Sequence, residues 1–162
     1  MSDPYLLTAE TPSPEDYCRL RTVAGLSPKS LEQARLGLPR TVHAVVVRHD
    51  GKAIGMGRVV GDGALFLQIV DIAVEPAHQG RGLGKLLLTQ LIRESEALGF
   101  RQMIAVIGDS AHVASINLHA SCGFAMVGTP KSVGFKFGRW LDSVLMERPL
   151  GPGDTTLPKT EE

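Results

Sequence analysis

The sequence contains little cysteine and carries no excess of charge. Its only cysteines, Cys18 and Cys122, are too few and too far apart for a disulfide framework. Seventeen basic and 17 acidic residues cancel, so electrostatics favour neither nucleic acid nor an anionic membrane. No apolar run reaches the ~18 residues of a membrane-spanning helix, and the N-terminus lacks the basic-then-apolar pattern of a signal peptide. We therefore expect a cytoplasmic protein without a nucleic-acid or membrane partner.

Size and composition are those of an ordinary globular protein. The chain has 162 residues, 43% hydrophobic and 21% charged, without internal repeats. This length favours one domain with its own core, which we place at residues 1–148. Residues 149–162 hold three prolines, two glycines and a charged end, and this composition predicts a disordered tail.

The most informative stretch is a strand, a glycine-rich turn and a helix in immediate succession. The apolar run in residues 64–74 predicts a buried strand that Glu75-Pro76 ends. Glycines then occupy positions 80, 82 and 84. Leucines at four-residue spacing follow and predict a helix, with its apolar side formed by Leu83, Leu87 and Leu91 together with Leu86 and Leu98. Because glycines allow close approach and the first helical N–H groups lack internal partners, this pattern predicts a pyrophosphate site.

Two familiar phosphate motifs do not fit this turn. The dinucleotide fingerprint G-x-G-x-x-G fails because the third glycine comes one residue early and Arg101-Gln102 stand where an acidic residue is needed. The P-loop fails because Leu86, instead of Ser or Thr, follows Gly84-Lys85. A glycine-rich turn without any ligand remains the alternative at this point.

The order of elements excludes a doubly wound parallel sheet. A strand at 5–9 and two helices, at about 14–24 and 29–36, come first. Three strands without intervening helices follow, at 42–47, 53–60 and 64–74, the first two joined by Asp50-Gly51, a strong hairpin signal. After the glycine turn and its helix come a strand at 103–107, a helix at 111–121, a strand from 124, a looped connection at 131–138 and a last strand at 139–148. We expect an α/β fold of the α+β type, with a mixed, mostly antiparallel sheet of six to seven strands and about four helices.

Two separated motifs resemble those of the GNAT N-acetyltransferase superfamily. Gln79-Gly80-Arg81-Gly82-Leu83-Gly84 resembles its coenzyme A motif, Q-x-x-G-x-G. The helix at 111–121, with Ser115, His119 and the following Gly123-Phe124, resembles its second motif. The resemblance implies the GNAT fold, acetyl-CoA as co-substrate, direct acetyl transfer to a primary amine in a ternary complex, and a homodimer. It also implies that the helix pair at 14–36 lies over the acceptor pocket.

The last third resembles one branch of this superfamily more closely. Residues 114–119 and 133–142 look like the phosphinothricin and methionine-sulfoximine acetyltransferases, whereas residues 26–84 look like small GNAT proteins of unassigned substrate. The acceptor implied is a small amine, with an amino acid or its analogue as one candidate. A coenzyme-binding sensor without turnover and an acetyltransferase acting on protein N-termini or lysines are the alternatives.

The resemblance also assigns residues to the coenzyme. Backbone groups of the strand end (Ile72, Ala73 and Val74) would pair with pantetheine, and Val74 N–H would polarise the thioester carbonyl. N–H groups of the turn (Gln79, Gly80, Arg81, Gly82, Leu83 and Gly84) would hold the pyrophosphate. Arg81 and Lys85 add charge there or are solvated surface cations. His112 and Ser115 share a helix face on the thiol side, although His112 could also simply face solvent.

The proton-transfer residues depart from the superfamily pattern. Many relatives carry a glutamate in the key strand as general base, but this position holds Gln68 or Ile69 here. Asp71 is the remaining carboxylate of that strand and our candidate base, unless it anchors a turn or a neighbouring strand. His119 stands where a tyrosine general acid is often found, and it is either that acid or a packed histidine. His112, His119 and Cys122 on one short helix cannot converge on a metal ion, so we expect no metal.

Overall fold

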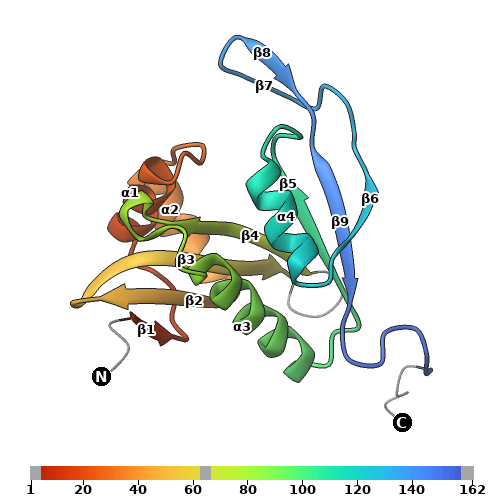
Figure 1. Cartoon of the computed structure of the whole chain (residues 1–162). Coiled ribbons are helices and arrows are strands. Elements are labelled where there is room, and N and C mark those ends of the chain that lie inside the picture. Colours follow the sequence, from red (N-terminus) through yellow and green to blue (C-terminus); the bar gives the residue numbers. More distant parts are fainter. Residues whose placement is uncertain (1–4, 63–66, 158–162) are drawn as a thin grey trace.

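The computed structural model describes residues 5–62 and 67–157, which form a twisted sheet with helices on both faces (Figure 1). The helices are α1 (Pro14–Val23), α2 (Leu31–Gly37), α3 (Leu83–Ala97) and α4 (Val113–Ser121), with short 3₁₀ turns η1 (Leu38–Arg40) and η2 (Pro76–His78). The strands are β1 (Tyr5–Thr8), β2 (Thr41–His49), β3 (Lys52–Gly61), β4 (Leu67–Val74), β5 (Gln102–Ile107), β6 (Ala125–Gly128), β7 (Gly134–Lys136), β8 (Arg139–Leu141) and β9 (Val144–Pro149). The predicted class of fold is confirmed; residues 64–66 of the predicted key strand lie outside the described residues.

Seven of the described strands form one sheet in the order β1-β2-β3-β4-β5-β9-β6, while β7 and β8 form a separate hairpin. All neighbours are antiparallel except β4 and β5, which pair in parallel. That pairing is short and ends at Ile69 and Ala105. Beyond this point no strand of the described residues pairs with the C-terminal half of β4 on the β5 side, so the sheet is split at its centre.

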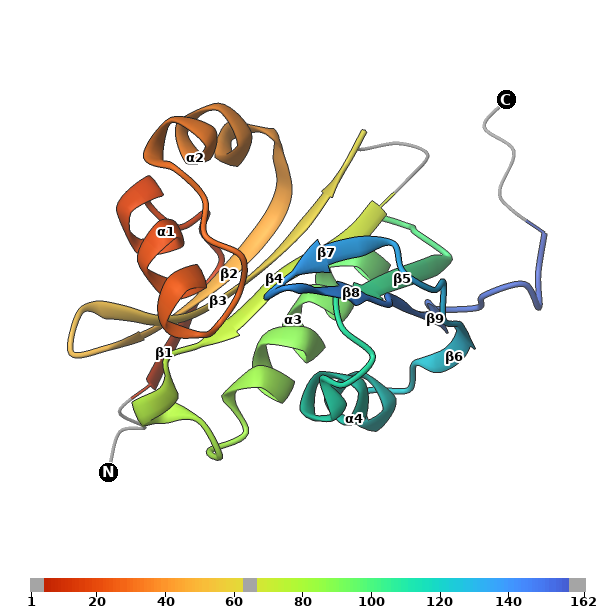
Figure 2. The same ribbon diagram turned by 90° about the horizontal axis from the view of Figure 1, so that it is seen from above.

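Two helices cover each face of the sheet, as Figure 2 shows from above: α1 and α2 lie on one face, α3 and α4 on the other. Because successive side chains of a strand point to opposite faces of the sheet, each strand contributes side chains to the core on either face. In β2, Val45 and Val47 belong to the cluster that includes α3, whereas Val46 belongs to the cluster that includes α1. The main core therefore lies under α3 and directly behind the glycine turn.

The apolar side of α3 differs in part from the predicted one. Leu83, Leu87 and Leu91 are buried as expected, but Leu86 and Leu98 are 43% and 56% exposed. At 100° per residue the buried stripe continues through Leu88 and Ile92, which flank it on the other side. The helix can approach the sheet closely because β3 carries Gly57, where a Cβ would come within 2.7 Å of Ile72 Cδ1 and 2.8 Å of Leu91 Cδ1.

The chain end differs from the prediction. The expected single strand at 139–148 is divided into β8, which pairs with β7 in a hairpin, and β9, which joins the main sheet. Residues 149–157, expected to be disordered, have defined positions: Leu150 is fully buried, and Arg101 donates to Gly153 O (2.7 Å) and Thr156 Oγ1 (2.9 Å). The buried Leu150 and the hydrogen bonds from Arg101 hold in place a stretch whose composition predicted no fixed structure. Residues 158–162 lie outside the described part.

Within the described residues, no helix has the length and apolar composition needed to cross a membrane. Both cysteines of the described residues, Cys18 and Cys122, are free.

Candidate functional site

The glycine turn presents backbone amides at the start of α3. Gly80 and Gly82 have φ of 74° and 79°, a left-handed conformation that side chains rarely adopt. Gly82 is the N-cap and offers no side chain to the helix, and its carbonyl accepts the first helical bond from Leu86 N (3.0 Å). The N–H groups of Leu83, Gly84 and Lys85 are those that an α-helix leaves without an internal partner. This turn therefore fits an anion such as a pyrophosphate.

The strand leading into the turn ends with an open backbone edge. Glu75 N donates to Ile54 O of β3 (2.8 Å), and backbone groups alternate direction along a strand, so those of Val74 point away from β3 toward the split. The Val74 carbonyl accepts a hydrogen bond from Gln79 Nε2 (2.9 Å), while the Val74 N–H faces the gap beside β4. An extended ligand could pair with this edge as an added strand.

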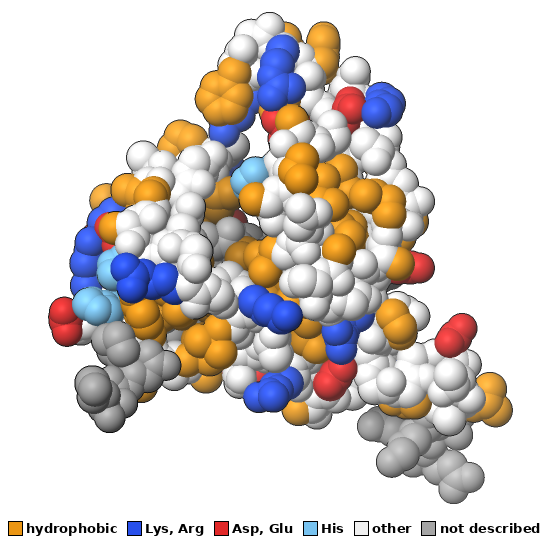
Figure 3. Space-filling model, in the orientation of Figure 1, with side chains coloured by type: hydrophobic (Ala, Val, Ile, Leu, Met, Phe, Trp, Pro, Cys, Tyr) orange, Lys and Arg blue, Asp and Glu red, His pale blue; other side chains and the backbone are white. Residues whose placement is uncertain are grey.

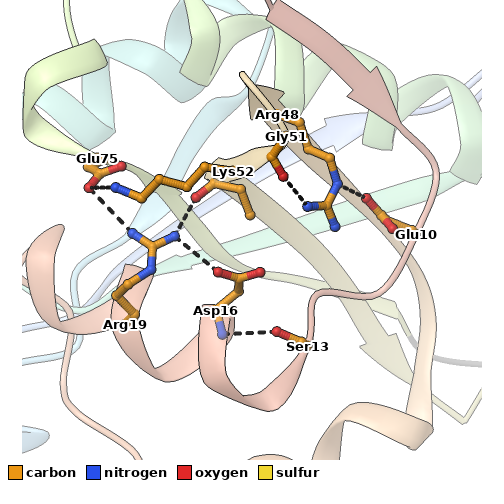
Figure 4. A network of polar contacts seen from close by, with 9 residues as sticks. Glu10, Ser13, Asp16, Arg19, Arg48, Gly51, Lys52 and Glu75 are labelled. Atoms are coloured by element: carbon orange, nitrogen blue, oxygen red, sulfur yellow. Dashed lines mark hydrogen bonds and ion pairs between the residues drawn. The ribbon is translucent and has the colours of Figure 1, made fainter.

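A salt-bridge network fixes the segment between β4 and the glycine turn (Figure 4). Glu75 pairs with Lys52 of β3 (2.8 Å) and with Arg19 of α1 (3.3 Å). The hydrogen bond from Lys52 lowers the pKa of Glu75, which keeps this carboxylate charged. Arg19 also contacts Asp16 (3.1 Å) and the carbonyl of Ala53. Helix α1, strand β3 and the start of the turn are thus held together.

These features line one cavity of about 280 Å³, which we call the coenzyme cavity. Its walls come from the end of α1 and the loop after it, from β4, from the glycine turn and from α4: Ala24, Leu26, Ile72, Ala73, Val74, Gln79, Gly80, Gly82, Leu83, Gly84, His112, Ala114, Ser115 and Leu118. The structure thus brings together all the residues assigned to the coenzyme from sequence except Arg81 and Lys85. Both of these are exposed, and Lys85 lines a separate groove with Arg93 and Arg148.

A second cavity of about 680 Å³, here called the acceptor cavity, adjoins the first. It is enclosed by the α1–α2 loop, the segment before α4 and the β7–β8 hairpin, and lined by Ala24, Gly25, Leu26, Ser27, Gly108, Asp109, Ala111, His112, Gly134, Phe135, Lys136, Phe137 and Leu141. Lys136 Nζ donates to Ser27 Oγ (3.1 Å) and so joins the hairpin to the loop. Figure 3 shows the molecular face hollowed between the α1–α2 side and the α4 side. Sequence reasoning placed the helix pair here, but it predicted a looped connection at 131–138 where the structure has the β7–β8 hairpin.

Asp71, the candidate base, is fully engaged by two arginines. It has φ of 60° at a bulge of β4 opposite Met56–Arg58 of β3, and its side chain is 8% exposed. One carboxylate oxygen contacts Arg21 of α1, and the other accepts from Arg58 Nη1 (2.7 Å). Neither oxygen is left for an incoming amine. The geometry supports the structural alternative that Asp71 anchors neighbouring elements.

His119 and Gln68 do not line either cavity. His119 is buried, its Nδ1 lies 2.8 Å from Ser115 O, and its ring meets Phe124 edge-on at 5.3 Å. This is the geometry of the packed histidine rather than of an acid facing a thiol. Gln68 lies at the start of β4 and lines a hollow of about 270 Å³ with Ile104 and Val106, on the part of β4 that pairs with β5.

Two buried histidines predict acid sensitivity of the fold. Burial lowers the pKa of His119 and of His43, whose Nδ1 is buried without a hydrogen-bond partner among the described residues. Below about pH 6.5 the unfolded chain binds protons that the folded chain binds less readily, so the free energy of unfolding should fall as pH falls through this range. Urea denaturation at pH 7.5 and pH 5 measures this. His119→Gln should reduce the slope relative to His49→Gln, which changes a histidine outside the core; equal slopes would contradict the prediction.

Fold and site together define a class of protein, one that accommodates a phosphate-bearing, extended ligand between split strands. Residues 9–124 match the sequence model of the acetyltransferase (GNAT) family, and the chain belongs to this family. The resemblance inferred from the two motifs is thereby confirmed.

The chain is also similar to individual members of this family. The chain is 45% identical over 119 residues to a phosphinothricin N-acetyltransferase of Alcaligenes faecalis, covering 71% of this chain and 60% of the relative. It is 45% identical over 89 residues to an L-methionine sulfoximine/L-methionine sulfone acetyltransferase of Salmonella typhimurium, covering 55% of this chain and 52% of the relative. The matches thus span between half and two thirds of these relatives' lengths.

A solved structure matches almost the whole chain. It is a GNAT superfamily phosphinothricin acetyltransferase from Sinorhizobium meliloti in complex with acetyl-CoA, and it superposes with a TM-score of 0.82 at 32% identity, covering 97% of this chain and 94% of that one. A putative acetyltransferase from Salmonella typhimurium with acetyl-CoA superposes with a TM-score of 0.75 at 28% identity, covering 92% and 95%.

Proposed function

We propose that this protein transfers the acetyl group of acetyl-CoA to the primary amine of a small molecule of the amino-acid type. One observation carries the proposal: in a member of the GNAT family, the open edge of Val74 and the first helical residues Leu83 and Gly84, whose amides have no partner within the helix, line a single cavity. The turn amides hold the pyrophosphate, and the β4 edge pairs with the extended pantetheine arm. Val74 N–H polarises the thioester carbonyl and stabilises the charge that develops on its oxygen.

The acceptor class rests on the second cavity and on the relatives. The acceptor cavity is enclosed on three sides and contains charges of both signs, Asp109 and Lys136, together with two phenylalanines. Such a cavity suits a compact zwitterion better than an extended peptide. The names of the relatives, which act on phosphinothricin and on methionine sulfoximine or sulfone, support the same choice.

The test is release of free thiol from acetyl-CoA with a panel of acceptors: phosphinothricin, methionine sulfoximine, methionine sulfone, polyamines and peptides. We expect turnover with the amino-acid analogues. Turnover confined to peptides would favour a protein acetyltransferase. Acetyl-CoA binding, measured by calorimetry, without turnover on any acceptor would favour a sensor. Failure to bind acetyl-CoA at all would overturn the proposal.

A homodimer in the cytoplasm completes the proposal. The β7–β8 hairpin carries Phe137 and Trp140, which are 77% and 64% exposed. Apolar side chains this exposed are typical of interaction surfaces, and a second copy of the chain would cover them. Light scattering after size exclusion should therefore give about twice 17.4 kDa, and Trp140→Glu should shift the mass toward the monomer. A monomeric wild type at micromolar concentration would contradict this.

The proposed cytoplasmic location rests on the cysteines: free Cys18 and Cys122 suit a reducing compartment.

A further inference from the structure

Acetyl transfer to an amine requires a group that removes a proton, and the residues chosen from sequence do not supply it. Asp71 has both oxygens engaged by arginines, and His119 is buried outside the two cavities. Gln68 has no basic side chain and lies at the other end of β4. The base must come from another part of the site.

The positions of the two cavities indicate where this general base lies. The amine enters through the acceptor cavity and the thioester occupies the coenzyme cavity, so the reacting atoms meet where the cavities join. Three described residues line both: Ala24, Leu26 and His112. Of these only His112 has an ionisable side chain. We propose that His112 is the general base that takes the proton of the acceptor amine, an inference that rests on the proposed function.

The segment before α4 holds His112 in place while leaving its side chain exposed. Its N–H donates to Asp109 O (3.0 Å), and its carbonyl accepts from Ser115 N (3.0 Å) and Ile116 N (3.2 Å). The backbone is therefore fixed at both ends of this short turn. An exposed imidazole on a fixed backbone can exchange protons with solvent between turnovers and return to the same position.

The charged groups around the imidazole suit this role. Asp109 and Lys136 line the same cavity, and Arg139 donates to Asp109 Oδ2 (2.7 Å). A hydrogen bond from Ala111 N, with a further contribution from Arg139, lowers the pKa of Asp109, so this carboxylate is charged near neutral pH. Electrostatic attraction to His112 contributes to this lowered pKa of Asp109, so the carboxylate and the imidazole lie close enough to interact across the cavity wall.

The proton balance of the reaction is complete with this one base. The acceptor arrives as an ammonium, and His112 takes one proton from it and passes that proton to solvent. The nitrogen lone pair forms the new C–N bond while the carbonyl π electrons move to oxygen, and their return breaks the C–S bond. The thiolate leaves with the bonding pair and takes up the second proton lost from nitrogen. The products are the amide, coenzyme A and one proton in solution.

His112→Gln tests the role, with Asn117→Ala as the matched control on the exposed side of the same helix. We expect kcat for the best acceptor to fall by about 10²–10⁴ at pH 7, while acetyl-CoA affinity measured by calorimetry, to which His112 contributes as one of several residues lining the cavity, falls far less than kcat does. The acidic limb of the kcat/KM profile should disappear in His112→Gln and persist in Asn117→Ala. Added imidazole should restore part of the activity of His112→Gly, a recovery that a merely structural role would not give.

A readout independent of turnover is the NMR titration of the imidazole. The His112 signal, identified by its loss in His112→Gln, should shift its titration midpoint when acetyl-CoA is bound, because the base lies at the cavity junction. An unchanged midpoint, or a kcat within threefold of wild type in His112→Gln, would overturn this role and leave the acetyltransferase standing. A wild type that turns over no amine would overturn the acetyltransferase and this role together.

Discussion

Asp71→Leu is expected to lower the free energy of unfolding by about 3–5 kcal/mol, because it removes the counter-charge of two buried arginines. Asp71 is the carboxylate shared by Arg21 and Arg58, whose side chains are only 10% and 7% exposed. Both guanidiniums lie within 5.5 Å of the Tyr17 ring centre and are also tied to oxygens of Ser27 and Thr41, so neither can swing out to water easily. Leucine would leave two buried positive charges without a counter-charge.

Urea denaturation at pH 7 measures this loss of unfolding free energy. Two further variants separate the effect of the lost charge from the effects of side-chain shape and backbone conformation. Asp71→Asn keeps the side-chain shape and tolerates the positive φ, so it should be more stable than Asp71→Leu but less stable than wild type. Asp50→Asn changes an exposed aspartate that also has positive φ and should stay within about 0.5 kcal/mol. A loss below about 1 kcal/mol in Asp71→Leu would show that the arginines find water or other partners.

The same variant separates the two roles weighed for Asp71. If this carboxylate were the base, Asp71→Asn would remove the acidic limb of the pH–rate profile. With Asp71 held between arginines, we expect folded Asp71→Asn to keep that limb, even where kcat falls because the bulge of β4 has moved. The contrast with His112→Gln then assigns the proton step to one residue.

Features fixed by local chemistry could be predicted from the sequence. Asp50-Gly51 gives a two-residue turn because both residues adopt positive φ, and they do so here. The glycine turn between a strand and a helix predicts an anion-binding helix start from spacing alone, and the structure has these three elements in that order. The apolar run predicts a strand that is buried throughout, but within Leu67–Val74 only Ile69 and Ala73 are buried. The element order, with three strands before the turn, was enough to exclude a parallel doubly wound sheet.

Features fixed by long-range partners could not be predicted. The role of Asp71 in β4 depends on Arg21 and Arg58, which contact its carboxylate from helix α1 and strand β3. An aspartate in a strand looks equally like a base or an anchor until those partners are known. Similarly, the α4 face spacing grouped His112 with His119, but only the three-dimensional packing shows that one is exposed between two cavities and the other is buried against Phe124.

Gly82→Asp is expected to weaken acetyl-CoA binding by about 10- to 100-fold, with a corresponding rise in KM. Gly82 lines the coenzyme cavity at the start of α3, and nothing in the structure lies within 4 Å of where its Cβ would be. Aspartate tolerates the φ of 79° better than most side chains do, so the turn should survive. Its charge would face the pyrophosphate at ~4–5 Å, which costs about 1–3 kcal/mol at the effective dielectric of a protein surface.

Matched variants isolate the charge from the backbone effect in this experiment. Gly82→Asn carries a side chain of the same shape without charge, and it should lose much less affinity than Gly82→Asp. Gly99→Asp places the same residue at the opposite end of α3, where the glycine also has positive φ, and should bind acetyl-CoA as the wild type does. Added salt should narrow the gap between Gly82→Asp and Gly82→Asn because it screens the repulsion. Equal affinities for these two variants, measured by calorimetry, would place the pyrophosphate away from the helix start and remove the main support for the proposed coenzyme site.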